Sequence, residues 1–314
     1  MWKKAIAIFA VLGIGVGLAV WGAGPRAIAT TDDGNVKETT YYNELKKTQV
    51  GQQTLANMVV MKVLDKNYGG DVSKQEIDQQ YQATKKQLGD AFEQQLTQSG
   101  MTPEMFRNSI KLQLLERQAV RANVKISNKQ LKQAYQDYQP KTQVSVILVD
   151  DEDKAKDVIK KLDDGDKFTD LVKSESKDST SKDKKGQLEA FDSTSTTVED
   201  SVKKAAFALK PGEYTKEPVK SENSNGYYII KQDSQEKKPS FDKLKSTLKE
   251  SLLEKDMNNQ DVVNAIVGEE LGKANVQIKD PELKNALATY TQAAAKKKAE
   301  AVKAHQKATK ADEK

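Results

Sequence analysis

The fold is decided by two apolar runs, Val144-Ser145-Val146-Ile147-Leu148-Val149 and Gly226-Tyr227-Tyr228-Ile229-Ile230. Both runs are rich in β-branched and aromatic residues and are bounded by polar clusters, a pattern typical of strands. Between them, apolar residues recur at helical spacing over 155–162, 168–172 and 198–209, and Lys210-Pro211-Gly212 is a turn that ends the last helix. Two strands that enclose several short helices within about ninety residues predict one compact α+β domain.

Helical patterns precede this domain. A helix is expected over 41–65, and Ser73-Lys74-Gln75-Glu76 and Ser127-Asn128-Lys129-Gln130 are capping-box patterns that start two further helices. Thr102-Pro103 starts another, because Thr is a good N-cap and Pro suits the first helical position. Gln139-Pro140 ends the last of these helices and forms the linker into the α+β domain.

Helical patterns also follow the domain. Apolar residues recur at helical spacing over 241–257 and 262–271, and Val276-Gln277-Ile278 is a short strand or an extended segment. Neither flank covers its own apolar stripes, so the simplest arrangement packs both flanks as one helical domain into which the α+β domain is inserted. Three independent modules are the alternative. The expected segments are 1–29, an export signal or anchor helix; 30–139 and 237–285, the helical domain; 140–236, the inserted domain; and 286–314, a Lys/Ala-rich tail, disordered or a solvated helix.

The order of segments in the inserted domain resembles the parvulin family of peptidyl-prolyl isomerases. The wider layout is similar to the PrsA-type foldases of Gram-positive bacteria, in which a parvulin domain is inserted into a helical chaperone domain behind an export signal. The segments that carry the resemblance are Val144-Ser145-Val146-Ile147-Leu148, Ser176-Lys177-Asp178, Gly186-Gln187-Leu188-Glu189-Ala190-Phe191, Ala205-Ala206-Phe207-Ala208-Leu209, Lys210-Pro211-Gly212-Glu213 and Gly226-Tyr227-Tyr228-Ile229-Ile230.

The resemblance implies a set of site positions, and most of them are changed in this chain. The family's two His fall at Val146 and Tyr228, and the only His in the sequence is His305. The acidic or thiol position falls at Ser179, or at Asp178 if the loop carries one inserted residue, and the hydroxyl position falls at Asn225. The apolar wall falls at Leu188, Val198 and Val202. We therefore assign no catalytic residue and expect a parvulin-like fold with weak or absent isomerase activity.

The beginning of the chain predicts export. A basic head, Trp2-Lys3-Lys4, precedes an uncharged apolar stretch over 5–24, and Ala27-Ile28-Ala29 fits a signal-peptidase site. The protein is either cleaved after Ala29 or held in the membrane by the uncleaved helix. Leu18-Ala19-Val20-Trp21-Gly22 resembles a lipobox in which Trp21 replaces the lipid-bearing Cys, and the chain contains no Cys. An exported protein at the outer face of the cell membrane, or secreted, without a lipid anchor is expected.

Composition excludes several classes of function. Without Cys and with one His, the chain lacks thiol catalysis, disulfides and His/Cys metal clusters. No phosphate-binding glycine motif is present, and no cofactor is expected. The net charge is +5, but basic and acidic residues are intermixed, which disfavours nucleic acid as a partner. Residues 296–314 hold seven Lys, which would attract an anionic wall polymer.

The leading functional prediction is an extracytoplasmic foldase that binds unfolded secreted proteins. Its alternatives are an active prolyl isomerase and a cell-surface protein that binds the wall. Met side chains suit loose binding of extended chains. We expect Met61 and Met101 to contact clients, and Met58 and Met105 to lie in the core. The sequence leaves open whether the chain forms a homodimer.

Overall fold

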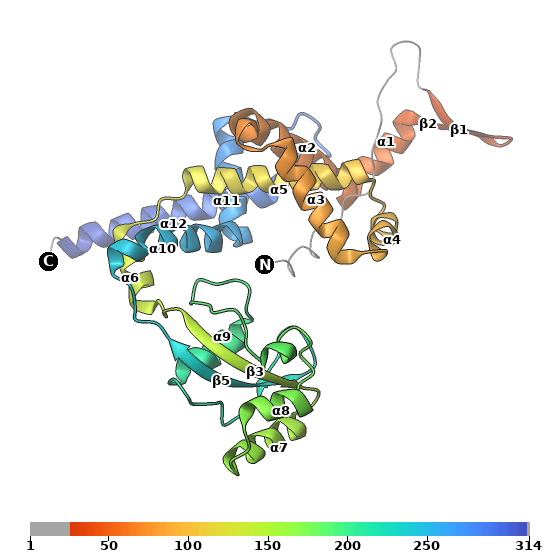
Figure 1. Cartoon of the computed structure of the whole chain (residues 1–314). Coiled ribbons are helices and arrows are strands. Elements are labelled where there is room, and N and C mark those ends of the chain that lie inside the picture. Colours follow the sequence, from red (N-terminus) through yellow and green to blue (C-terminus); the bar gives the residue numbers. More distant parts are fainter. Residues whose placement is uncertain (1–25, 313–314) are drawn as a thin grey trace. The chain divides into compact units, whose positions relative to one another are not determined.

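A computed structural model describes residues 26–312, with side chains up to residue 303 (Figure 1). The predicted export or anchor helix over 5–24 lies outside the described residues. The described chain divides into two compact units. One consists of Ile126–Leu252, and the other, the helical unit, consists of residues 26–125 and 253–312.

The first unit is built on an antiparallel sheet, as the two apolar runs predict. Its strand order is β3-β5-β4, with β3 spanning Thr142–Val149, β5 spanning Tyr227–Gln235 and β4 spanning Val219–Lys220. Four helical segments surround the sheet: α7 (Glu152–Asp163), α8 (Phe168–Glu175), the 3-10 turn η3 (Lys182–Lys184) and α9 (Asp200–Ala208). The short strand β4 was not predicted from the sequence, because two residues carry no periodicity.

Alternation along β3 gives this sheet two apolar faces. Ile147 and Val149 lie in one buried cluster with α7 and α8, whereas Val144 and Val146 lie in a second cluster with α9 (Figure 1). Successive strand residues point to opposite faces, so the continuous run Val144–Val149 can fill both clusters. This arrangement places α9, and with it the second cluster, on the face opposite α7 and α8.

The two ends of the sheet domain lie together. Thr142 pairs with Gln235, and the Glu236 N–H donates to the Lys141 carbonyl over 2.8 Å. Beyond them, α6 (Asn128–Asp137) packs on the first part of α10 (Phe241–Met257) through a cluster that includes Leu131 and Leu248. Adjacent ends are what an inserted domain requires. The division between the two units falls within α10.

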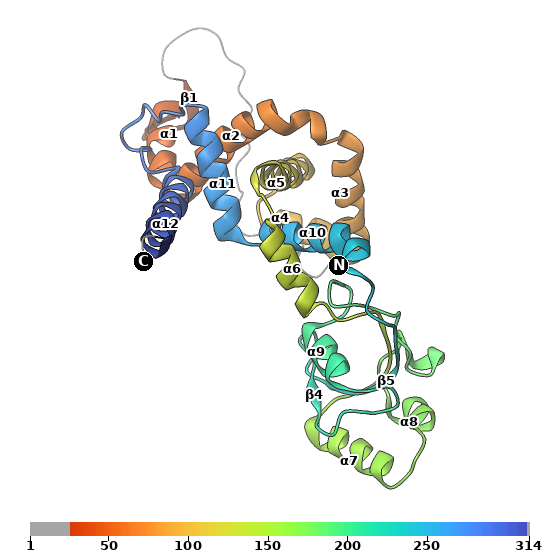
Figure 2. The same cartoon turned by 90° about the vertical axis from the view of Figure 1, so that its left-hand side faces the viewer.

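The helical unit joins segments from both sides of the insertion. It contains the hairpin β1 (Ala27–Thr31) and β2 (Gly34–Lys37), then α1 (Glu38–Lys47), α2 (Gln49–Tyr68), the 3-10 turn η2 (Gly69–Asp71), α3 (Lys74–Leu88), α4 (Ala91–Gln98), α5 (Pro103–Asn123), α11 (Gln260–Lys273) and α12 (Ala288–Asp312). Helix α5 contacts α2, α3 and α11, and Figure 2 shows α11 between α12 and α5. Segments on both sides of the insertion therefore share one helical core, which confirms the predicted α+β class with an inserted domain.

The predicted single helix over 41–65 is wrong, because the chain breaks at Thr48. This residue has an extended backbone, and its hydroxyl accepts from the Gly51 N–H over 3.0 Å. A Cβ on Gly51 would lie 2.1 Å from the Leu45 carbonyl oxygen, so only Gly allows this close turn. The other caps behave as predicted: Ser73 and Thr102 accept from backbone N–H groups, and Ser127 forms a full capping box with Gln130.

Residues 286–314 include helix α12, whose first turns pack on α11. Leu287 and Tyr290 are buried, and Lys297 pairs with Glu269 over 2.9 Å. A Cβ on Gly268 of α11 would lie 2.1 Å from the Tyr290 carbonyl oxygen, so the two helices approach through a glycine notch. Residues 276–278 form no strand. The proposed segment boundaries remain predictions.

No described helix is long and apolar enough to span a bilayer.

Candidate functional site

The second cluster of the sheet domain brings together apolar residues that are distant in sequence. Val146 and Val202 are buried in it, and three partly buried residues pack against them: Leu188, Val198 and Tyr228. Val146 faces α9 because of its place in the β3 alternation, and Val202 comes from α9 itself. Val198 lies just before α9, which begins at Asp200, not at 198 as predicted. The structure thus brings together five of the eight predicted site positions.

Asp178 organises the loop after α8. One carboxylate oxygen accepts from the Thr180 N–H and hydroxyl over 3.1 and 2.7 Å, and the other accepts from the Ser181 hydroxyl over 2.6 Å. Burial would raise the pKa of Asp178, but these donors outweigh it and hold the pKa below its usual value. Asp178 is therefore an ionised loop anchor at neutral pH. Its neighbour Ser179 is exposed.

Gly186 brings this loop against the strand at Val146. The Val146 N–H donates to the Gly186 carbonyl over 2.8 Å, and a Cβ on Gly186 would lie 2.6 Å from the Val146 carbonyl oxygen. Gly186 has φ +82°, and the residue before it, Lys185, has φ +58°. The close approach to Val146 therefore requires Gly at position 186. Lys185 adopts a left-handed conformation, which costs a non-glycine residue about 1–2 kcal/mol.

Tyr228 stands where the resemblance places the second His. Its hydroxyl donates to a Glu199 carboxylate oxygen over 3.4 Å. Burial, with the nearby charges of Glu199 and Asp178, raises the pKa of Tyr228 to about 12, so the hydroxyl stays protonated at neutral pH. Sequence reasoning missed Glu199, whose only signal was an acidic residue just before a helix. Asn225, the predicted hydroxyl position, is exposed in the turn before β5.

This second cluster offers little acid–base chemistry. Val146 provides only hydrocarbon, Tyr228 a neutral hydroxyl, and Asp178 a carboxylate already satisfied within its own loop. No imidazole lies among the described side chains, since the only His of the sequence, His305, belongs to α12.

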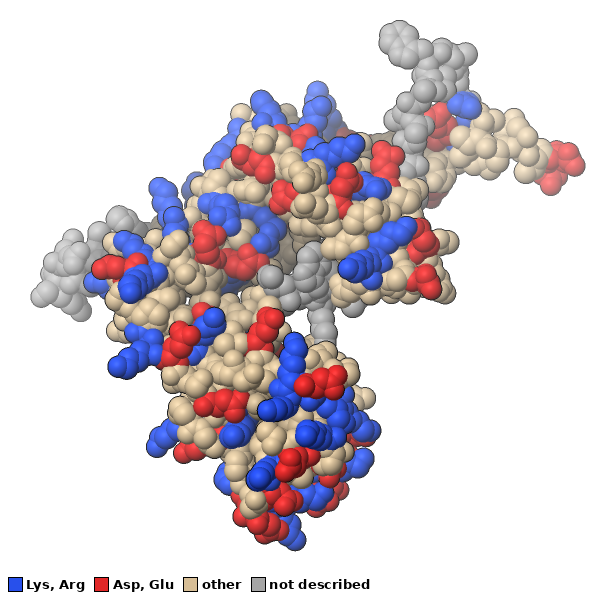
Figure 3. All heavy atoms as spheres, in the orientation of Figure 1, with Lys and Arg blue, Asp and Glu red and all other residues tan. Residues whose placement is uncertain are grey.

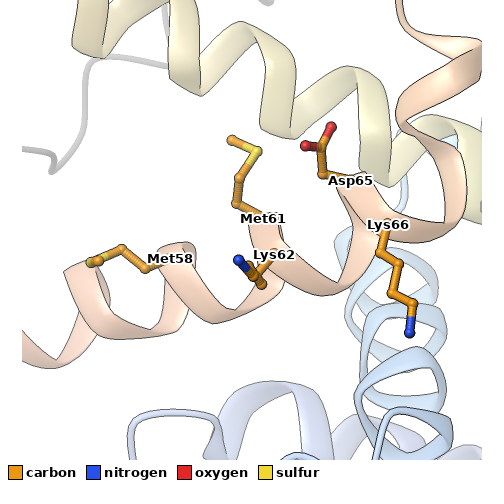
Figure 4. Close-up of a pocket in the computed structure, with 5 residues that line it drawn as sticks. All are labelled: Met58, Met61, Lys62, Asp65 and Lys66. Carbon is orange, nitrogen blue, oxygen red and sulfur yellow. The ribbon is translucent and has the colours of Figure 1, made fainter.

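A second candidate surface lies on α2 in the helical unit. Met58 is 65% exposed, contrary to its predicted place in the core. A shallow hollow of about 480 Å³ lies along the helix (Figure 4), lined by Met58, Met61, Lys62, Asp65 and Lys66. Met61 and Asp65 extend to one side of the helix and Lys66 to the other (Figure 4). Asp65 pairs with Lys111 over 2.7 Å, whereas no ion pair is recorded for Lys62 or Lys66 among the described residues.

Met101 does not fit the predicted role in client contact. It is 5% exposed, and its N–H donates to the Leu96 carbonyl over 2.9 Å. The residue follows a tight turn after α4 that carries its side chain into the core. Met61 is partly buried and adjoins exposed Met58, so it remains a candidate, and Met105 is partly buried as well.

Charges are intermixed on the molecular face shown in Figure 3, where Lys and Arg alternate with Asp and Glu over most elements. Among the described residues, no group of three or more metal-binding side chains is placed to hold a metal ion.

Comparison with known proteins agrees with these features. Residues 116–234 match the rotamase family model described as a PPIC-type PPIase domain. The foldase protein PrsA of Pediococcus pentosaceus is 40% identical over 92% of this chain and 96% of its own length. Foldase protein PrsA 1 of Lactobacillus johnsonii is 38% identical, with the same coverage of both chains.

Solved structures agree as well. The crystal structure of foldase protein PrsA from Streptococcus pneumoniae matches with a TM-score of 0.76 and 32% identity, covering 84% of this chain and 99% of that one. PrsA from Lactococcus lactis, at 23% identity and a TM-score of 0.60 over 84% of this chain and 99% of that one, supports the fold. From its sequence identity to relatives over nearly its whole length, the chain belongs to the PrsA foldase family, with an inserted domain of the parvulin type.

Proposed function

We propose that this chain is an extracytoplasmic foldase that assists exported proteins mainly by holding them, and that its prolyl isomerase activity is weak or absent. One observation carries the second part: Val146 and Tyr228 occupy the two sequence positions that hold His in the parvulin resemblance, on adjacent strands of the sheet. Rotation about an X-Pro bond faces a barrier of about 20 kcal/mol. A site without imidazole can still bind a proline ring, but it offers fewer groups to stabilise the twisted amide.

The beginning of the chain supports the proposed extracytoplasmic location. The basic head and the apolar stretch over 5–24 have the form of an export signal. Ala29, the predicted cleavage position, lies in β1, whose five residues are all exposed. N-terminal sequencing of the mature protein distinguishes cleavage from anchoring, because cleavage gives a first residue of Thr30 and an anchored chain keeps the apolar stretch.

Two surfaces are proposed to hold clients. The second cluster of the sheet domain offers the partly buried side chains of Leu188, Val198 and Tyr228. The α2 hollow offers exposed Met58 with partly buried Met61. Flexible, polarisable thioethers adapt to many apolar side chains, as a binder without sequence preference requires. Substituting both Met58 and Met61 by Ser should weaken client binding without unfolding α2, because Met58 is exposed and Met61 is only partly buried.

The test is suppression of aggregation of an unfolded, proline-poor client by a chain that begins at Thr30. A matched variant lacks 141–236 and joins the ends by a short Gly-Ser linker, which the Lys141–Glu236 hydrogen bond shows to be geometrically simple. If both proteins suppress aggregation, the helical unit holds clients by itself. If neither does, the holding function is wrong.

Attachment to an anionic wall polymer remains a second candidate function. Lys296, Lys298 and Lys303 are exposed on α12. Substituting these three residues by Gln tests the idea without removing the packed part of α12, which deletion of 286–314 would do. Loss of wall retention by the substituted protein would favour this function, and unchanged retention would remove it.

A further inference from the structure

Exposed apolar side chains are concentrated at the start of the described chain. Among the described residues, the markedly exposed large apolar side chains are Ile28, Val36, Tyr41, Tyr42, Met58 and Val302. Four of these six belong to the hairpin β1–β2 and to the first turns of α1, and they are between 41% and 50% exposed. Every residue of both hairpin strands is exposed, so no described element covers either face of the hairpin. A two-stranded hairpin without a covered face is only marginally stable in water.

The backbone holds the open end of this hairpin at the start of α1. The Glu38 N–H donates to the Arg26 carbonyl over 2.8 Å. Tyr41 and Tyr42 lie three and four residues after Glu38, which places them one helical turn along the same side of α1. Figure 1 shows the hairpin extending beyond the end of α1, away from the other helices of the unit. The residues Ile28, Val36, Tyr41 and Tyr42, here called the hairpin patch, therefore lie at one end of the helical unit.

The preceding sequence determines how far this end can lie from a membrane. The uncharged apolar stretch over 5–24 ends two residues before Arg26. An extended chain spans at most about 3.5 Å per residue, so Ile28, four residues after Gly24, lies within about 14 Å of the end of the stretch. The headgroup layer on each side of a bilayer is about 5–8 Å thick. If the stretch spans the bilayer, the hairpin must lie in the headgroup layer or just outside it.

The hairpin requires a chain that is not cleaved at the predicted position. Ala27 pairs with Lys37, and Ala29 pairs with Val36. Cleavage after Ala29 would remove Ile28 and would leave only two residues of β1 to pair with β2. The hairpin patch therefore belongs to the anchored form of the protein, which keeps the apolar stretch.

The side chains of this region suit the interface between lipid and water. Tyrosine is enriched there, because its ring is apolar and its hydroxyl can remain hydrated. Arg26 and Lys37 lie at the open end of the hairpin, where basic side chains can reach lipid phosphates. Asp32 and Asp33 form the turn at the opposite end. This distribution allows the acidic turn to remain in water while the open end of the hairpin contacts the headgroups.

We propose that the hairpin patch inserts into the headgroup layer of the bilayer that holds the apolar stretch, so that the start of the helical unit docks on the membrane. The partner is the lipid surface, not a client and not a second copy of the chain. Docking restrains the helical unit close to the membrane, whereas an undocked unit would move freely on its tether.

Single-site labelling tests the proposal in the full chain, which contains no Cys of its own. The variants I28C, V36C and Y41C each carry one environment-sensitive fluorophore at an exposed position. M58C is the matched control, because Met58 is 65% exposed and belongs to the same unit. Each protein is reconstituted into vesicles of phosphatidylglycerol and phosphatidylcholine in equal parts. Iodide quenches fluorophores in water, and a lipid with a nitroxide on its acyl chain quenches those in the bilayer.

The three patch positions should be quenched by the nitroxide lipid and protected from iodide. We expect iodide quenching about fivefold weaker than at M58C, because interfacial insertion places apolar side chains about 5–10 Å into the boundary between headgroups and acyl chains. The comparison with M58C also corrects for vesicles in which the protein faces inward, since all labels share that orientation.

A second variant separates the patch from its tether. I28S, V36S and Y41S are combined in one chain that carries the fluorophore at Y42C. These substitutions remove exposed side chains, so circular dichroism should remain unchanged. The fluorophore should lose its quenching by the nitroxide lipid, although the apolar stretch still anchors the protein.

Four results would overturn the proposal. Iodide quenching at the patch equal to that at M58C would show that the patch lies in water. Protection from iodide without quenching by the nitroxide lipid would show that protein, such as a second copy, covers the patch. Unchanged lipid quenching after the triple substitution would show that the tether alone holds the hairpin near the lipid. A mature protein that begins at Thr30 would lack the complete patch. None of these results depends on client binding, so the proposed foldase function is tested separately.

Discussion

Substitution of Gly268 by Ala tests whether α12 is part of the helical core. A Cβ at this position would lie 2.1 Å from the Tyr290 carbonyl oxygen and 2.9 Å from the Cβ of Ala294. Intrinsic propensity alone would predict stabilisation, because Ala is better than Gly inside a helix by about 0.5–1 kcal/mol. Packing predicts destabilisation instead, because α12 must move away from α11 to make room for the methyl group.

The size of the destabilisation by G268A depends on which of two movements of α12 costs less free energy. Complete release of α12 would expose Leu287 and Tyr290, both buried, at about 2 kcal/mol each. A small shift of α12 costs about 1–3 kcal/mol, the usual range for overpacking. The shift is cheaper, so G268A should destabilise the helical unit by about 0.5–2 kcal/mol once the gain in helix propensity is subtracted.

Gly272 provides the matched control. It lies one turn later on α11, and a Cβ there would meet no atom within 4 Å. G272A should therefore stabilise the protein by about 0.5 kcal/mol. Far-UV circular dichroism during heating measures both variants, and hydrogen exchange assigns the effect to α11 and α12. We expect the melting temperature to fall by about 5 °C in G268A and to rise slightly in G272A. Equal stabilisation by both substitutions would refute the packing of α12 on α11.

Three further predictions concern stability. K185G should stabilise the sheet domain by about 0.5–1 kcal/mol, because Gly adopts φ +58° without strain, and a lower urea midpoint would refute this. S127A should cost about 1 kcal/mol by removing both bonds of the capping box with Gln130, measured as faster amide exchange in α6. Burial raises the pKa of Glu116 to about 7, so the folded protein binds this proton more tightly than the unfolded chain. Stability should therefore fall by about 1–3 kcal/mol between pH 4.5 and 7. E116Q should remove that decline, and an unchanged pH profile in E116Q would show that another group causes it.

The sequence predicts the parts of this fold that depend on local chemistry. The apolar run at Val144–Val149 predicts a strand, and Ser127 with Gln130 predicts a helix start to the residue. The parvulin-like order of segments predicts which residues share the second cluster of the sheet domain. Val146 and Val202 lie about fifty-five residues apart and meet in one cluster.

Features that depend on tertiary packing could not be predicted. The helical pattern is interrupted at Thr48, because Gly51 lets the Leu45 carbonyl oxygen approach closely. The spacing of apolar residues gives no sign of this interruption. Met58 and Met101 exchange their expected places, because burial depends on which helix face finds a neighbour. The Lys/Ala composition of residues 286–314 does not indicate that Tyr290 is buried. Its burial depends on the close approach of α12 to α11 at Gly268. Glu199 is hydrogen-bonded to Glu222, in a loop more than twenty residues away in sequence.

The central claim is that the protein holds unfolded clients without efficient isomerisation, and a prolyl isomerase assay tests the second part most directly. The protein, beginning at Thr30, would be compared with an authentic parvulin at equal concentration, on a peptide with a central Ala-Pro and with isomerisation followed by coupled proteolysis. Loss of both His positions, now Val146 and Tyr228, predicts a rate close to that of the uncatalysed reaction. Turnover comparable to that of the parvulin would contradict the claim and would show that the sheet domain catalyses isomerisation without imidazole.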